Sequence, residues 1–198
     1  MNRSILVFVA VLLAVATSSA SAQVVPSATG RQFSLTAGGL ASAFQPEYAG
    51  GFVPSESPNR LYGVGGFVDV QFTRWFQLEA EGRWLRFNEF VNIDQDTYLV
   101  GPRLPIRRLR LWRATPYVKA LAGRGYMNYE FNEGSGNYTT LAYGGGLDVN
   151  LGKRFSARGD FEYQQWLDWP QIPGVSNTML YPYGVSFGLG YRILGGRP

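Results

Sequence analysis

The chain has 198 residues, 16% of them charged, and carries a formal net charge of +4 at pH 7 with no His and no Cys. A net charge this small gives no reason to expect nucleic acid as a partner. Because Cys is absent, the fold cannot depend on disulfides, thiol catalysis is excluded, and most transition-metal sites lose their usual ligands.

Residues 1–22 have the three regions of a secretory signal peptide. Arg3 supplies positive charge, Ile5–Ala16 is apolar, and Ala20-Ser21-Ala22 matches the small-residue cleavage pattern. The apolar segment is too short for a membrane-spanning helix, so an N-terminal anchor is the weaker interpretation. We therefore predict that residues 1–22 are a signal peptide and that residues 23–198 form one exported domain.

The exported part of the chain alternates apolar and polar side chains with a period of two, whereas an amphipathic helix needs 3.6. The alternation is clearest over Phe76–Trp84, and Phe67 interrupts the polar face of the preceding segment. Pro102 cannot donate a ladder hydrogen bond, so we expect a local irregularity there. We expect strands over residues 32–44, 61–72, 76–84, 96–104, 115–129, 139–151, 155–167 and 180–193.

The connections between these strands alternate in length. Residues 73–75 and 152–154 are tight turns, and the longer connections are residues 45–60, 88–95, 130–138 and 168–179. Barrels of the outer membrane have short periplasmic turns and longer outer loops. If residues 23–31 are periplasmic, all four longer connections lie outside the cell. The sequence therefore predicts an all-β fold, an eight-stranded antiparallel up-and-down transmembrane β-barrel in the outer membrane of a Gram-negative cell envelope.

One connection departs from this rule. Residues 105–114 are on the periplasmic side but are longer than a tight turn, and they contain Arg107, Arg108, Arg110 and Arg113. We interpret them as a solvated hairpin end near lipid headgroups. A docking patch for anionic lipid or for a periplasmic partner is the alternative.

In such a barrel the apolar faces meet lipid and the polar faces line the lumen. Charges in a confined space must pair or stay hydrated, so we expect a paired network that fills the lumen. A conduction pathway or a ligand site is the alternative. The predicted lumen charges are Asp69, Glu79, Glu81, Arg83, Arg103, Lys119, Asp148, Arg158, Asp160, Glu162 and Arg192.

The Trp residues lie near predicted strand ends, where we expect them in the interfacial girdle, because Trp prefers the headgroup level. Residues 166–169 could instead form a sugar- or partner-binding patch at the outer rim. The predicted interfacial aromatics are Trp75, Trp84, Trp112, Trp166 and Trp169.

The absence of His excludes the family mechanisms of the known barrel enzymes, since lipid A acyltransferases and deacylases, phospholipase A and omptin-type proteases all use an active-site His. Glu79 and Glu81 share one strand face, but no nucleophile accompanies them. The acidic residues of the loops form no ligand-spaced calcium motif. We therefore expect no catalytic residue, no metal and no cofactor.

Four segments resemble the small OmpA/OmpX-type barrels, and in particular the outer membrane protein β-barrel domain group: Gly66–Phe72, Thr97–Leu104, Thr115–Gly125 and Tyr183–Ile193. The resemblance covers the exported domain and implies a protein surrounded by outer-membrane lipids. The chain departs from these barrels by continuing past Arg192 instead of ending on an aromatic residue, so we expect the insertion signal within residues 187–191.

Our leading hypothesis is a non-enzymatic, monomeric barrel with a structural, surface-interaction or adhesion role, in which the extracellular loops bind a ligand or surface partner. The alternative is a narrow porin or channel for ions and small solutes through the charged lumen. A soluble exported barrel that binds a small ligand ranks third, and an enzyme ranks last.

Overall fold

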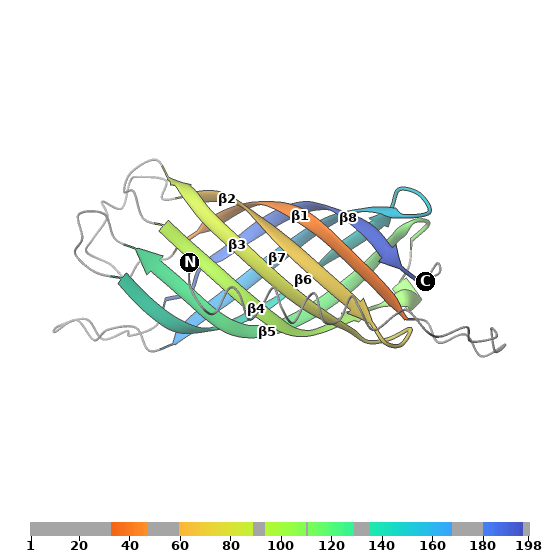
Figure 1. Ribbon diagram of the computed structural model, residues 1–198, viewed down its shortest axis with the longest axis horizontal. Coiled ribbons are helices and arrows are strands. Elements are labelled where there is room, and N and C mark those ends of the chain that lie inside the picture. Colours follow the sequence, from red (N-terminus) through yellow and green to blue (C-terminus); the bar gives the residue numbers. More distant parts are fainter. Residues whose placement is uncertain are drawn as a thin grey trace, which may run out of the picture. The chain divides into compact units, whose positions relative to one another are not determined.

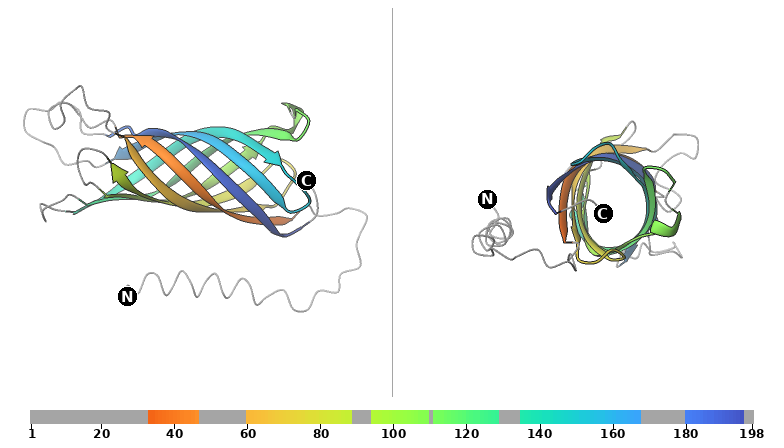
Figure 2. Two further views of the ribbon diagram at one scale, coloured as in Figure 1. Left: turned by 90° about the horizontal axis from the view of Figure 1, so that it is seen from above. Right: turned by 90° about the vertical axis from the view of Figure 1, so that its right-hand side faces the viewer.

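The computed structural model describes residues 33–46, 60–88, 94–109, 111–128, 135–167 and 180–195. These residues form eight antiparallel strands, each paired with the next, and β8 pairs with β1 to close the barrel (Figure 1). The end-on view in Figure 2 shows the closed ring. The predicted architecture is therefore confirmed. The strands are β1 (Ser34–Gln45), β2 (Leu61–Gln71), β3 (Gln77–Asn88), β4 (Asp94–Pro105), β5 (Ala114–Asn128), β6 (Ser135–Asn150), β7 (Phe155–Leu167) and β8 (Tyr183–Leu194).

The signal peptide lies outside the described residues and stays a prediction. Among the residues that the structure describes, no helix is long and apolar enough to cross a membrane.

Side chains along each strand point alternately to the lumen and to the outside, since successive residues of a strand face opposite sides. On the outside, Val100, Phe187 and Leu189 are 50%, 70% and 64% exposed. On the inside, Glu79 and Arg83 are fully buried. An apolar outer face around a charged interior is the arrangement of a barrel surrounded by lipid, and the reverse of a soluble sandwich.

The two ends of the barrel differ, and we name them by their connections. The turn end holds the tight turns after β2 and β6, where Thr73 N donates to Phe76 O at 3.4 Å and Gly152 N donates to Phe155 O at 3.3 Å. The short 3-10 helix η1 (Arg107–Leu109), between β4 and β5, lies at this end too (Figure 1). The loop end is the opposite end, and most of its connecting residues lie outside the described ranges.

Strand β7 spans the predicted residues, whereas β6 and β8 differ at the loop end. β6 begins at Ser135 instead of residue 139, because its first residues pair with the end of β5. Pairing with a neighbouring strand has overridden the turn-like composition of this segment. β8 begins at Tyr183, and Leu180 forms only an isolated bridge with Trp166.

The irregularity expected at Pro102 is present. The pairing of β4 with β5 skips Gly101 and Pro102 and resumes in the same register at Arg103, opposite Lys119. A proline without an N–H group accounts for the gap, because it removes one hydrogen bond without shifting the strand.

Apolar side chains fill the lumen toward the loop end, although the sequence predicted a polar lumen. They lie at inward positions of the strands, and two clusters of them are in contact across strands. The largest members of this apolar layer are Phe44, Leu61, Leu85, Leu99, Leu121, Met127 and Trp166.

The prediction that Trp166 belongs to the interfacial girdle is wrong. Its side chain is fully buried in the lumen, where Nε1 donates to Oε1 of Gln164 at 2.9 Å. Trp166 has the same strand parity as Glu162 and Gln164, so the alternation of β7 directs it inward.

The other predicted girdle residues that the structure describes lie outside the lumen. Trp84 lies on the outer face, where Nε1 donates to the Tyr98 hydroxyl at 2.9 Å. Trp75, between β2 and β3, and Trp112, between η1 and β5, are exposed. Their contact with headgroups stays a prediction, and Trp169 lies outside the described residues.

Gly125 provides the space that the Trp166 ring occupies. A Cβ at Gly125 would lie 2.5 Å from Cη2 of Trp166 and 2.7 Å from Oγ1 of Thr140. We expect Gly125→Ala to lower the free energy of unfolding by about 1–3 kcal/mol, because it overpacks the lumen. The measurement is denaturant unfolding in detergent micelles, followed by Trp fluorescence.

The matched control is Gly159→Ala, whose Cβ would lie 3.6 Å from the Phe187 ring in ordinary contact. Its free energy of unfolding should stay within about 0.5 kcal/mol of the wild type. Equal effects of the two substitutions would contradict the packing of Trp166 against Gly125.

Candidate functional site

The candidate site is the charged lumen, which strands β2 to β7 build together. Residues i and i+2 share one strand face, so the charged positions of β3 and of β7 point inward in succession. Ten of the eleven predicted lumen charges form ion pairs with one another, and Arg192 lines a cavity at the turn end. The ten are Asp69, Glu79, Glu81, Arg83, Arg103, Lys119, Asp148, Arg158, Asp160 and Glu162.

Lys119 is the centre of the half of the network nearer the loop end. Its buried ammonium group contacts four carboxylates, two from β3 and two from β7. Its Nζ lies 3.1 Å from Glu79, 2.9 Å from Glu81, 3.3 Å from Asp160 and 2.9 Å from Glu162. One cation therefore holds together side chains from opposite walls of the barrel.

Arg83 completes this half of the network. Its Nη1 and Nη2 donate to the two oxygens of Glu162 at 2.6 and 3.2 Å, and it lies 2.8 Å from Glu81. The guanidinium also stacks on the Phe44 ring, 4.7 Å from its centroid. A planar fork with two carboxylates and an aromatic face is a geometry that Arg, but not Lys, can satisfy.

Arg103 and Arg158 form the half nearer the turn end, and each contacts Asp69, Asp148 and Glu79. Arg103 Nε lies 3.2 Å from Glu79, and Arg158 Nη1 lies 3.0 Å from the same oxygen. The other oxygen of Glu79 accepts from Lys119. Glu79 therefore joins the two halves into one network.

Two aromatic rings stack on the guanidinium groups of these two arginines. The Arg158 guanidinium lies 3.8 Å from the centroid of Phe67, and that of Arg103 lies 3.6 Å from the centroid of Tyr117. Such stacking is favourable, above all where water is excluded. Phe67, which interrupts the polar face in the sequence, is thus the platform for a lumen arginine.

This arrangement suits structural packing better than catalysis. Each of the six carboxylates contacts at least one cation, and Ser42 and Ser186 hydrogen-bond each other at 2.9 Å in a chain without His. Across the described ranges, no group of three or more Asp or Glu side chains could hold a metal ion. The ion pairs connect opposite walls of the lumen and can hold the barrel shut.

The Arg-rich connection divides its charges between two environments. Arg107 lines the cavity at the turn end, whereas Arg108 and Arg113 are exposed, and Arg110 lies outside the described residues. Arg113 stacks on Trp112, with 5.3 Å between its Cζ and the ring centroid. No pattern in the sequence predicted that one of these arginines would line the lumen.

Comparisons with known proteins identify the family and the fold. A family model described as outer membrane protein beta-barrel domain matches residues 8–192. Neisserial surface protein A is 8% identical, with a TM-score of 0.57 over 81% of this chain and 96% of that chain. The outer membrane protein OprG from Pseudomonas aeruginosa is 13% identical, with a TM-score of 0.52 over 82% and 97%. A comparison with curated protein sequences finds no significant match.

A third solved structure, the N-terminal β-barrel domain of Pseudomonas aeruginosa OprF, is 15% identical, with a TM-score of 0.51 over 82% of this chain and all of that domain (100%). At these identities, the three structures show a common fold and nothing more specific.

Removing the charge of Lys119 should be far more damaging than removing an outer one. Lys119→Met removes one of the cations that four buried carboxylates share. We therefore expect the free energy of unfolding to fall by about 3–5 kcal/mol. The control is Arg86→Met, because Arg86 pairs with Asp96 on the rim and is 37% exposed; we expect a loss within about 1 kcal/mol. The folded fraction on unboiled gels and the unfolding midpoint measure both, and similar small losses would contradict a buried network.

Proposed function

This chain belongs to the outer membrane protein β-barrel domain family, and on that premise we propose that it is a non-enzymatic surface barrel whose outer loops carry its interactions. Its place is the bacterial outer membrane, with the apolar outer face in lipid. The turn end then faces the periplasm and the loop end faces outward.

The observation that carries this proposal is the filled lumen. Two layers lie across it, the ion network around Glu79 and the apolar layer that includes Leu85 and Trp166. An eight-stranded barrel has an interior just wide enough for side chains. A barrel filled in this way offers partners only its ends and its lipid-facing surface.

The outer loops are the surface most suited to binding. They connect strands that the closed barrel holds rigidly, and loops on a rigid scaffold commonly carry recognition. Their sequences, residues 47–59, 89–93, 129–134 and 168–179, are rich in Gly, Pro, Ser and Asn and contain several aromatic residues. These residues lie outside the described ranges, so the proposal rests on their position and composition.

The charged lumen keeps the narrow channel as a second candidate. Conduction would require the network to open, and leaving one buried charge without its partner costs about 3–5 kcal/mol. A potential of 100 mV acts on a unit charge crossing the membrane with only about 2.3 kcal/mol. Ordinary membrane potentials are therefore too weak to hold this lumen open.

Conductance distinguishes the two candidates. In a planar bilayer, we expect the refolded protein to give no discrete current steps up to about 100 mV, because the network stays paired at that potential. Current steps in the wild type that change with Glu81→Lys or Arg158→Glu would establish the channel instead. Folding is verified beforehand by the shifted migration of unboiled samples.

A loop exchange tests where binding takes place. Replacing residues 48–58 or 170–178 with Gly-Ser segments of equal length should leave the barrel folded and reduce adherence of producing cells, since the strands stay intact. Adherence is measured on polystyrene and on an array of glycans and matrix proteins, against cells that lack the protein. Full adherence of both folded loop variants would refute the loop proposal.

A further inference from the structure

The connections at the two ends of the barrel carry opposite charge. In the sequence, the three connections at the turn end contain seven basic residues and no acidic one, whereas the four at the loop end contain six acidic residues and one basic one. The turn end is therefore basic and the loop end is acidic. The turn-end connections are residues 72–76, 106–113 and 151–154, and the loop-end connections are residues 46–60, 89–93, 129–134 and 168–182.

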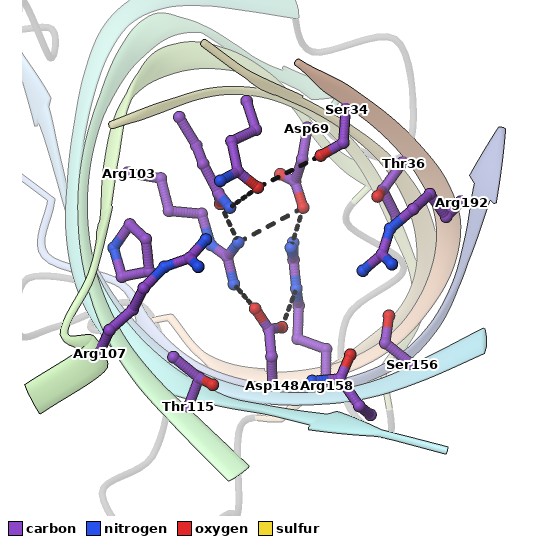
Figure 3. Close-up of a pocket in the computed structure, with 14 residues that line it drawn as sticks. Ser34, Thr36, Asp69, Arg103, Arg107, Thr115, Asp148, Ser156, Arg158 and Arg192 are labelled. Atoms are coloured by element: carbon purple, nitrogen blue, oxygen red, sulfur yellow. Dashed lines mark hydrogen bonds and ion pairs between the residues drawn. The ribbon is translucent and has the colours of Figure 1, made fainter. Parts of the chain in front are cut away.

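The strand carboxylates nearest the turn end face inward. Asp69 and Asp148 each contact both Arg103 and Arg158 within the lumen (Figure 3). Arg107 also lines the lumen and is not part of the outer surface. The exposed basic residues of the three connections, in the part of the chain that the structure describes, are Arg74, Arg108, Arg113, Lys153 and Arg154.

Each turn-end connection places one of these arginines against an aromatic ring. Trp and Tyr prefer the headgroup level of a membrane, where part of the ring is wet. A guanidinium beside such a ring lies at the depth of the lipid phosphates, which it can bind through paired N–H donors. The pairs, with the distance from Cζ to the ring centroid, are Arg74 and Trp75 (4.9 Å), Arg113 and Trp112 (5.3 Å), and Arg154 and Tyr191 (5.9 Å).

The connection between β4 and β5 adds apolar side chains to this basic surface. Trp112 and Leu111 are 86% and 79% exposed, the highest values among the large apolar residues that the structure describes. Exposed apolar side chains next to basic ones are typical of a surface that contacts a membrane. In the end-on view of Figure 2, this connection, drawn in green, lies at the edge of the ring, where the surrounding lipid begins.

Trp112 occupies a backbone position that suits glycine. Leu111 N donates to Ala114 O at 3.0 Å and Ala114 N donates to Leu111 O at 2.8 Å, which closes a two-residue turn with Trp112 and Arg113 at its tip. The φ of Trp112 is 53°, the only positive value at a non-glycine residue within the described ranges. Glycine adopts this conformation at the first position of such a turn without steric cost. A tryptophan held there points to a role for the ring other than forming the turn.

We propose that the connection between β4 and β5 is a binding surface for anionic phospholipid headgroups. Trp112 and Leu111 enter the boundary between headgroups and acyl chains, and Arg108 and Arg113 bind the lipid phosphates. A basic surface attracts anionic lipids more strongly than zwitterionic ones, so phosphatidylglycerol is preferred over phosphatidylcholine. The inference requires the barrel to lie in a membrane and is independent of the outer loops.

The test is native mass spectrometry of the folded protein, released from uncharged detergent micelles that contain equal amounts of the two lipids with the same acyl chains. The wild type should retain more phosphatidylglycerol. Arg108→Gln combined with Arg113→Gln should lower the ratio of bound phosphatidylglycerol to bound phosphatidylcholine by about tenfold, because each arginine attracts the anionic headgroup. The matched control is Arg60→Gln combined with Arg124→Gln, which removes two exposed charges near the loop end and should leave the ratio unchanged.

Trp112→Gly separates lipid binding from folding. Glycine suits the turn, so the unfolding midpoint should not fall, whereas the amount of retained phosphatidylglycerol should fall because the ring is lost. A lower midpoint with undiminished lipid retention would make the ring a structural element and overturn its proposed role.

Three further results would overturn the proposal. They are no preference for phosphatidylglycerol in the wild type, an unchanged ratio in the folded Arg108 and Arg113 variant, and an equal loss in the control pair. The second result would favour a soluble partner for this connection, and the third would reduce the preference to net charge. Migration of unboiled samples on a gel verifies the folding of each variant.

Discussion

A closed barrel of eight strands leaves an interior that only side chains can fill, and the rest of this structure depends on that constraint. Lipid outside the barrel cannot solvate a charge, so each inward polar group must find its partner inside. Glu79 and Lys119 meet this requirement through their ion pairs. The side chains must also fit the limited space. Gly125 has no side chain, and the Trp166 ring occupies the space that a side chain there would fill.

The buried charges explain why the strands pair in one register. A slip by one residue turns every side chain of a strand to the opposite face. In β3 this would place Glu79, Glu81 and Arg83 against lipid, where a basic side chain at the midplane costs about 2–4 kcal/mol. The network therefore contributes to specificity even where its net contribution to stability is small.

The period of two predicted which charged residues share the lumen, and Glu79, Lys119 and Arg158 are buried there. It was not used to place the apolar part of the lumen. It could not predict their partners, because Lys119 and Glu79 are 40 positions apart and meet only through the order and stagger of the strands. The prediction for Trp166 followed the preference of Trp for the headgroup level. Its position in β7, on the same strand face as Glu162, directs it into the lumen instead. Inward leucines near the loop end follow the same alternation: Leu85 lies two residues after Arg83 on the inner face of β3.

Arg83 of β3 and Glu162 of β7 lie on opposite walls of the ring, and their contact has a consequence for assembly. Neither side chain can reach the other until the strands between them are in place and the ring is nearly complete. A chain that entered the membrane one hairpin at a time would carry unmatched charges through hydrocarbon. Insertion and closure that proceed together avoid this cost.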